Sequence, residues 1–207
     1  MGRYLGSSCR LCRREGEKLF LKAEKCFSEK CPVEKGKKYP PGQHGKKPAK
    51  LSEYGRRLRE KQKLKRLAGI TERQLKRYFK IAQRQKGLVG ENLLRIIECR
   101  LDNVVYRIGW AGSRKFSRQL ITHKKICVNG KYVTTPSYLV TPGEKITLKD
   151  DMRENIYVLK SLERTSSLPS WIKYDPEHFT AEVVSSPTIE EISFPVNATL
   201  IVEFYSR

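Results

Sequence analysis

The sequence predicts a mixed α+β chain in three parts: a four-cysteine segment, a mainly helical region, and a small helix-plus-strands module. Apolar residues recur every three or four positions between residues 71 and 109, which is the spacing of amphipathic helices. Short apolar runs flank Asn129-Gly130, the strongest two-residue signal for a β-hairpin. Four of the six cysteines lie before residue 32 and set an N-terminal extension apart. The 207 residues leave room for one large or two small domains.

The charge of the chain points to a polyanionic partner. The formal net charge is +21, and an unpartnered globule of this size would repel itself strongly. Residues 1–90 contain 27 Lys and Arg against 8 Asp and Glu, whereas residues 163–207 contain 3 against 7. We therefore expect the polyanion to contact the N-terminal two-thirds of the chain.

The sequence argues against a membrane protein. It contains no run of about 18 apolar residues, which a membrane-spanning helix needs. Its first residues, MGRYLGSSC, lack the apolar core of a signal peptide. We therefore expect a cytoplasmic chain, in which thiols stay reduced.

The spacing of the N-terminal cysteines predicts a metal site. Two residues separate Cys9 from Cys12, four separate Cys26 from Cys31, and thirteen join the two pairs. In a reducing compartment, clustered cysteines indicate metal binding before they indicate disulfides. Four thiolates suit one structural Zn²⁺ ion and leave no open position for catalysis. An iron–sulfur cluster also accepts four cysteines and stays open as an alternative. The two remaining cysteines lie far apart and are expected to be ordinary small buried residues.

A basic loop and two basic helices are expected after the cysteines. Residues 37–50 contain three prolines and two glycines without an apolar period, so they form either a phosphate-binding loop or a mobile linker. Ser52 is expected to cap a first helix that ends at Gly69. Thr71 begins a capping-box pattern for a second helix that ends near Gly87. Both helices are basic on one side, which favours contact with a nucleic acid.

A core helix and a helix–hairpin unit are expected next. The apolar period runs through residues 91–109 and predicts one continuous helix. Ser113 is expected to cap the following helix, with Arg114, Lys115 and Arg118 facing outward. Strands are expected at residues 125–133, folded as the hairpin, and at 137–140, 141–148 and 200–206.

An enzyme and a DNA-binding regulator are the alternative interpretations of the sequence. Arg100-Leu101-Asp102 resembles the catalytic-aspartate motif of pseudouridine synthases, which often carry a similar small module. It lies inside an apolar-periodic helix, however, where Asp102 is expected to form a structural salt bridge. Only about 50 residues follow the module, too few for a catalytic domain, so we predict no enzyme and no small-molecule substrate. A zinc-containing DNA-binding regulator stays open, because basic faces alone do not distinguish DNA from RNA.

Four separated motifs indicate a resemblance to a known family. They are, in order, YPPGQHG, YGRRLREKQKLK, RLDNVVYR and LIVEFYSR. The stretch SRKFSRQLITHKKICVNGKYV resembles a small RNA-binding module found in several RNA proteins. Together these motifs make the chain similar, over nearly its whole length, to the family of bacterial small-subunit ribosomal protein four. The paired cysteines resemble the zinc-bearing branch of that family.

The resemblance implies a fold and a function. The fold would have a zinc-binding extension with a basic loop (1–45), a discontinuous helical domain (46–98 plus about 165–207) and an inserted RNA-binding module (99–164). The function would be that of a structural constituent of the small ribosomal subunit. It would bind the 5′ domain of 16S ribosomal RNA as a primary binder and nucleate assembly of the subunit body. The family contacts ribosomal proteins five and twelve, lies near the mRNA entry path and contributes to translational accuracy.

Basic and aromatic residues of these segments form the candidate RNA-binding set. Lys and Arg release counterions from a folded RNA, while rigid domains select its shape. In the extension, the basic loop and the start of the first helix, the expected residues are Arg3, Arg10, Arg13, Arg14, Tyr39, Gln43, His44 and Tyr54. On the two basic helices they are Arg56, Arg57, Arg59, Lys61, Lys63, Arg66, Arg73, Lys76 and Arg77. In the module they are Arg114, Lys115, Arg118 and Lys131.

The acidic end of the chain predicts a different surface. Glu190, Glu191 and Glu203 are expected to face a basic protein neighbour, for which the resemblance implies ribosomal protein five. The alternative is that these acids balance nearby bases within the fold.

Overall fold

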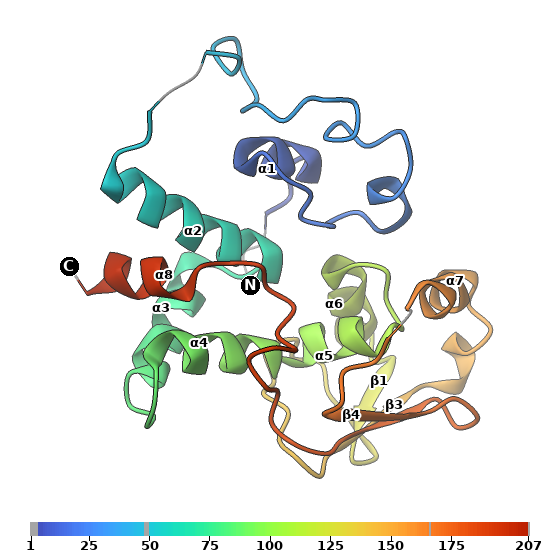
Figure 1. Ribbon diagram of the computed structural model, residues 1–207. Helices are drawn as coiled ribbons and strands as arrows, with labels where there is room; N and C mark the ends of the chain where they lie inside the picture. The colour runs from blue at the N-terminus through green and yellow to red at the C-terminus, as the bar shows by residue number, and fades with distance from the viewer. Residues whose placement is uncertain (1–3, 48–49, 166, 207) are drawn as a thin grey trace. The chain divides into compact units, whose positions relative to one another are not determined.

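The computed structural model describes residues 4–47, 50–165 and 167–206, shown as a ribbon in Figure 1. It divides into two compact units. Unit 1 combines Met1–Leu93 with Phe194–Arg207, and unit 2 is the continuous segment Leu94–Ser193. Unit 1 is therefore built from both ends of the chain. Within the described residues, no helix is long and apolar enough to span a bilayer.

The first basic helix of unit 1, α2, has both of its predicted ends. It spans Glu53–Ala68. The side chain of Ser52 accepts a hydrogen bond from the backbone N–H of Gly55, which satisfies a donor that the first helical turn leaves free. Gly69 ends the helix with φ 63°, in the left-handed region that glycine tolerates best.

The second basic helix, α3, begins as predicted but ends earlier. It spans Glu72–Ala82, and Thr71 and Gln74 form the predicted capping box. The expected end near Gly87 is wrong. Residues 83–87 are all exposed and none is apolar, so a longer helix would bury nothing to offset the entropy of ordering it.

The last helix, α8 (Ala198–Tyr205), replaces the strand expected at residues 200–206. The side chain of Asn197 accepts hydrogen bonds from the backbone N–H groups of Thr199 and Leu200, at 3.0 and 3.3 Å, and so caps a helix. Ile201 is fully buried, and Figure 1 shows α8 alongside α2. The strand prediction failed because a short apolar run does not distinguish a strand from a packed helix.

Three further elements complete the description of unit 1. The cysteine extension contains α1 (Ser8–Glu15) and the short 3-10 helix η1 (Ala23–Cys26). Helix α4 (Val89–Glu98) starts in unit 1 and ends in unit 2.

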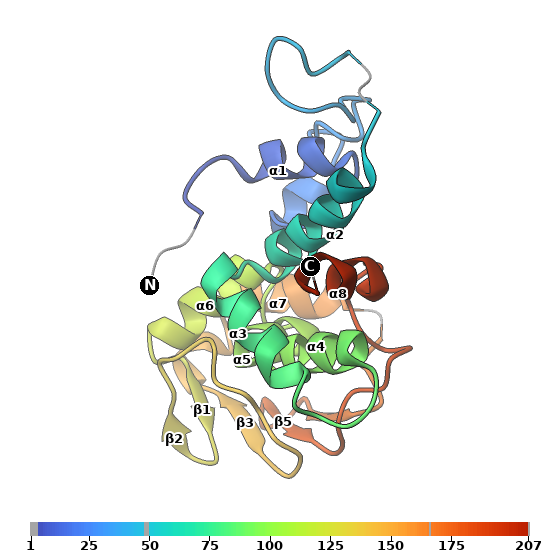
Figure 2. The same cartoon turned by 90° about the vertical axis from the view of Figure 1, so that its left-hand side faces the viewer.

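Unit 2 is an antiparallel sheet covered on one side by helices. Within the described residues the sheet has five strands in the order β2-β1-β3-β5-β4 (Figure 2). The strands are β1 (Ile126–Val128), β2 (Lys131–Tyr132), β3 (Lys145–Leu148), β4 (Ile172–Asp175) and β5 (Thr180–Val183). The helices are α5 (Leu101–Ile108), α6 (Arg114–Thr122), the 3-10 helix η2 (Asp150–Met152) and α7 (Ile156–Arg164). Both views place α5, α6 and α7 on the same side of the sheet. Trp110 and Trp171 are fully buried in the core between the two layers.

The predicted hairpin is confirmed, and the sheet is larger than expected. Asn129 and Gly130 have φ 48° and 77°, the pair of positive values that a tight type I′ hairpin needs. β5 pairs with β3, matching Ala181 to Ile146, and β4 pairs with β5. Unit 2 continues to Ser193. The chain therefore returns to the helical domain later than the predicted position, about residue 165.

The continuous helix expected over residues 91–109 is broken in two. α4 ends at Glu98 and α5 begins at Leu101, while Arg100 between them is extended. The N–H of Leu101 donates to the carbonyl of Tyr138 at 2.8 Å. Arg100 forms an isolated bridge with Leu139, and this bridge is all that remains of the strand expected at 137–140. Contacts from a distant segment thus interrupt a sequence that is periodic enough to stay helical.

Candidate nucleic-acid interface

Several cations of α2 are turned toward the acids of the cysteine extension. Arg59 Nη1 lies 3.5 Å from Oε1 of Glu15, and Arg66 is ion-paired with the same carboxylate. Lys63 Nζ lies 2.7 Å from Glu17 Oε1. Burial raises the pKa of Glu15, although the two guanidinium groups act against this shift. These three predicted RNA-binding residues therefore help hold the extension on α2.

The four cysteines of the extension lie mostly out of solvent. Cys12, Cys26 and Cys31 are buried, and Cys9 is half-buried. Burial raises the pKa of the Cys12 thiol, and the charges of the other three thiolates raise it further. The backbone N–H of Lys22 donates to Sγ of Cys26 at 3.3 Å, a contact that stabilises a thiolate.

This donor set fits zinc by its chemistry, because four soft thiolates from one short segment are the usual ligands of a structural zinc site. Within the part of the chain that the structure describes, no three or more His, Cys, Asp or Glu side chains are positioned as a ready metal site.

The basic loop gathers cations around one aromatic ring. The guanidinium of Arg13 lies 4.9 Å from the ring centre of Tyr39, and Lys46 Nζ lies 5.8 Å from it, both within the range of cation–π contact. Arg13 also donates to the carbonyl of Pro40 at 3.5 Å. The other predicted residues of this region, Arg10, Arg14, Gln43 and His44, are exposed. Arg3 lies outside the described residues.

The exposed cations of α3 form what we call the α3 basic face: Arg73, Lys76, Arg77 and Lys80. All four are exposed, and none has an ion-pair partner within the described residues. The sequence reasoning missed Lys80. It lies seven positions after Arg73 and three after Arg77, so helical periodicity alone could have found it.

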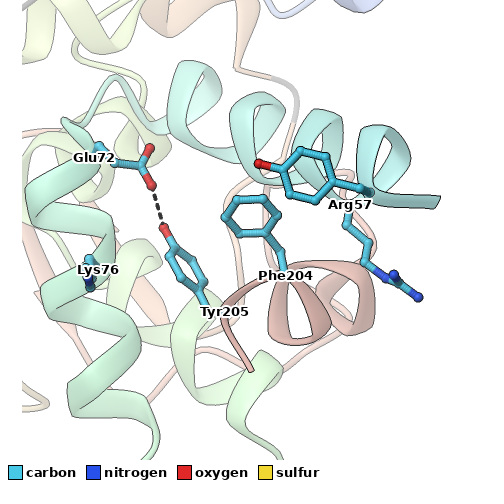
Figure 3. Close-up of a pocket in the computed structure, with 6 residues that line it drawn as sticks. Arg57, Glu72, Lys76, Phe204 and Tyr205 are labelled. Carbon is cyan, nitrogen blue, oxygen red and sulfur yellow. Dashed lines mark hydrogen bonds between the residues drawn. The ribbon is translucent and has the colours of Figure 1, made fainter. Parts of the chain in front are cut away.

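A pocket of about 450 Å³ opens among α2, α3 and α8. It is lined by Tyr54, Arg57, Glu72, Lys76, Phe204 and Tyr205. Figure 3 shows the hydroxyl of Tyr205 pointing from α8 to the carboxylate of Glu72 on α3, a hydrogen bond of 2.9 Å. Of the predicted residues that line it, Tyr54 and Lys76 are exposed, and Arg56, outside the lining, is exposed too.

Two predicted RNA-binding cations, Arg57 in the pocket lining and Lys61 outside it, serve the packing of unit 1. Lys61 is buried, donates to Glu72 at 2.7 Å and lies 4.3 Å from the ring centre of Phe204. Arg57 Nε donates to Glu203 at 2.5 Å. Burial acts to raise the pKa of Glu72, but hydrogen bonds from Lys61, Tyr205 and Lys65 outweigh it, so the pKa lies below its usual value.

The module's predicted outward cluster is only partly outward. Arg114 is buried, donates to Asn103 at 2.7 Å and stacks on the Tyr106 ring at 4.4 Å, so its predicted outward orientation is wrong. The reason is that Arg114 is the first residue of α6, where it meets the polar end of α5. Lys115 and Lys131 are exposed as predicted.

Asp102 is the centre of a buried ion-pair cluster. Arg100 binds it through Nε and Nη2 at 3.0 and 2.7 Å, and Arg118 Nε lies 2.7 Å from it. Asp102 and Arg100 are almost completely buried. The prediction of a structural salt bridge at Asp102 is therefore confirmed, and Arg118 is part of it.

The three acids expected to face a protein partner differ in their surroundings. Glu190 is exposed in unit 2. Glu191, also in unit 2, accepts hydrogen bonds from the N–H of Ser170 and the hydroxyl of Thr188, at 2.6 and 3.0 Å. Glu203 belongs to unit 1, where it binds Arg57. Two of the three acids thus have partners within their own unit.

Comparison with known proteins matches the whole chain. Residues 3–98 match the ribosomal protein S4/S9 N-terminal domain, and residues 99–146 match the S4 domain. The small ribosomal subunit proteins uS4 of Dictyoglomus turgidum and Dictyoglomus thermophilum are each 54% identical over 207 residues, covering all of both chains. That of Thermoanaerobacter pseudethanolicus is 50% identical over 207 residues, again covering both chains completely.

The resemblance of the sequence to the family of small-subunit ribosomal protein four is therefore confirmed, whereas its resemblance to the zinc-bearing branch stays a prediction. The uS4 proteins are structural components of cytoplasmic ribosomes and not enzymes, which also confirms that the Arg-Leu-Asp string is not catalytic. With full-length identities of 50–54%, the chain belongs to the uS4 family of small ribosomal subunit proteins.

Proposed function

We propose that this chain binds 16S ribosomal RNA directly as a primary binder of its 5′ domain and nucleates assembly of the body of the small subunit. The α3 basic face carries the proposal, because it presents four exposed cations on one short helix. Full-length similarity to uS4 proteins supports ribosomal RNA as the polyanion, in the cytoplasm.

The proposed mechanism combines counterion release with a fixed shape. About 6–10 phosphate contacts would make affinity fall roughly 10³–10⁵-fold between low and moderate salt. The exposed residues Arg10 and Arg14 of unit 1, and Lys115 and Lys131 of unit 2, would make further phosphate contacts, each on its own unit. The buried or paired cations would act indirectly, by fixing the helices that carry the exposed ones.

We further propose one structural zinc ion on Cys9, Cys12, Cys26 and Cys31. The ion would supply folding free energy to the extension, since a structural metal stabilises the unit that it ties together. The burial of three of these thiols and the N–H donor at Cys26 support this role. An iron–sulfur cluster is the alternative. Metal analysis of the purified chain separates the two, because one zinc ion and no iron is the expected content.

Ribosomal proteins five and twelve are the proposed protein partners, through which the chain would contribute to translational accuracy. Glu190 is the acid that best supports such a contact, because it is exposed, whereas Glu191 and Glu203 accept hydrogen bonds from their own unit. Glu190→Lys should therefore raise misreading by ribosomes without weakening binding to isolated ribosomal RNA. Unchanged decoding accuracy would remove Glu190 from the contact.

A competition experiment tests the RNA assignment. The full chain is bound to a labelled transcript of the 16S 5′ domain at fixed salt, and unlabelled transcript or duplex DNA is added. We expect the transcript to compete far better than duplex DNA of the same phosphate content. The variant with Arg73, Arg77 and Lys80 all changed to Glu should bind the transcript more weakly and with a flatter salt dependence. Equal competition by duplex DNA would favour a DNA-binding regulator instead.

A further inference from the structure

Two phenylalanines of the cysteine extension form an exposed aromatic pair. Phe27 is 63% exposed and Phe20 is 38% exposed. Their ring centres lie 5.3 Å apart with the planes tilted by 34°, within the range of favourable aromatic contact. Single apolar residues on a surface are common, but here two partly exposed rings contact each other.

The backbone holds both rings in place. Each ring follows a buried residue, since Leu19 precedes Phe20 and Cys26 precedes Phe27. The N–H of Phe27 donates to the carbonyl of Glu24 at 3.0 Å. Phe20 has φ 48°, in the left-handed region that a phenylalanine rarely adopts. The two buried neighbours and the hydrogen bond of the Phe27 N–H fix the backbone that carries the rings, and this pre-organisation lowers the entropy cost of binding a partner.

The surface around the pair is cationic. Residues 4–47 contain 12 Lys and Arg against 5 Asp and Glu. Three of the five acids, Glu15, Glu17 and Glu34, are ion-paired with lysine or arginine side chains. Exposed lysines lie two or three positions from the rings along the chain: Lys22, Lys25 and Lys30. An aromatic surface among cations fits a nucleic acid better than it fits an apolar protein groove.

We propose that Phe27, supported at its side by Phe20, is a stacking platform for an unpaired base of the ribosomal RNA. This inference rests on the proposed function and adds a base contact to its phosphate contacts. An unpaired nucleotide is required because a base face is accessible only outside a helix. The nearby lysines bind the adjoining phosphates. A phenylalanine ring offers no hydrogen bond, so the platform accepts any base.

Binding measurements with the full chain and the 16S 5′-domain transcript test the platform. Phe27→Ala and Phe27→Leu should each weaken affinity by roughly 5- to 150-fold, the effect of losing one stacked base. Phe27→Tyr should bind like the parent chain, because it keeps the ring. The slope of log affinity against log salt should stay the same in all three, since the ring displaces no counterion. Ultraviolet cross-linking of the parent complex should place a nucleotide adduct on Phe27.

A matched control is Leu88→Ala, which truncates another apolar side chain of unit 1, 67% exposed, and should leave affinity unchanged. Parent-like affinity of Phe27→Leu would overturn the platform, because leucine keeps the apolar contact but not the ring. Loss of a protein partner with unchanged RNA affinity in Phe27→Ala would overturn it too. In both cases the parent chain would keep its salt-dependent binding, whereas failure of the proposed function would show as no such binding by the parent.

Discussion

Arg114 and Lys115 are neighbours at the start of α6 and have opposite surroundings. Arg114 is buried against Asn103 and Tyr106, and its Nη2 donates to Ser193 at 2.8 Å. Lys115 is exposed. Helical periodicity contains a signal that separates them, because Arg114 lies seven positions before Ile121 on the same face of the helix, and Ile121 is fully buried. The sequence did not show that this face would meet the polar side chains of Asn103 and Ser193, which only the fold brings close.

Charge reversal at these two positions should have different effects. Arg114→Glu would place a buried carboxylate where a guanidinium now balances the buried Glu98, and should lower the free energy of unfolding by about 3–5 kcal/mol. Lys115→Glu should lower it by less than Arg114→Glu does, because the Lys115 side chain is exposed, while weakening RNA binding. Urea unfolding of both variants and the parent checks this. Equal stability of the Arg114→Glu variant and the parent would contradict the buried role.

Glu72 should make the stability of unit 1 depend on pH. Its pKa is lowered in the folded chain, so its stabilising effect is present above the ordinary value of 4.5 and is lost as pH falls through the lowered pKa. Glu72→Gln should therefore cost about 1 kcal/mol at neutral pH, a value reduced because the side chain is partly exposed, and progressively less as pH falls below 4.5. Urea unfolding at neutral pH and at a series of pH values below 4.5 measures the difference. The same cost at every pH would show that the charge of Glu72 is not what stabilises unit 1.

At the scale of elements, the sequence predicted the helix starts correctly. It did not predict the features that depend on contacts between distant segments. Ser52, Thr71 and Ser113 accept backbone hydrogen bonds at the helix starts that the sequence indicated. These signals act between residues close in sequence, so one stretch of sequence contains them. The break at Arg100 and the addition of β4 and β5 depend on pairing with Leu139 and with β3, which no local pattern records.

Helix α8 gives the clearest test at this scale. Asn197→Ala removes the side chain that accepts the N–H groups of Thr199 and Leu200, and should lower the free energy of unfolding by about 1 kcal/mol. Asn197→Asp is the matched control, because it keeps an acceptor and should be nearly neutral. If alanine and aspartate proved equally stable in denaturant unfolding, the cap would not be what selects a helix here.

The cysteine extension should respond to metal removal as a separate element. Chelation should unfold residues 4–45 and leave the remaining helices and the sheet protected, because a structural metal stabilises only the unit that it ties together. Hydrogen exchange followed by peptide measures this region by region. Affinity for RNA should fall only in part, since the exposed cations of α3 remain. Cooperative unfolding of the entire chain on chelation would contradict a peripheral site.

Across the whole molecule, acidic side chains determine which Lys and Arg side chains are left to bind a polyanion. Glu15, Glu72 and Asp102 each accept ion pairs from two or more basic residues, which they hold in the packing of their unit. The α3 basic face has no such acid within the described residues. The Lys and Arg side chains behind the net charge of +21 therefore fall into two sets. One set stabilises the fold, and the other is exposed and can bind a polyanion. Composition predicted the partner class, but only the structure separates the two sets.

A hydroxyl-radical footprint of the full chain on 16S ribosomal RNA tests the central claim most directly. Direct binding predicts protected nucleotides that cluster in the 5′ domain, lose protection as salt is raised, and lose it at lower salt in the Arg73, Arg77 and Lys80 charge-reversal variant. Absence of protection at low salt, or protection scattered outside the 5′ domain and insensitive to the variant, would contradict the claim.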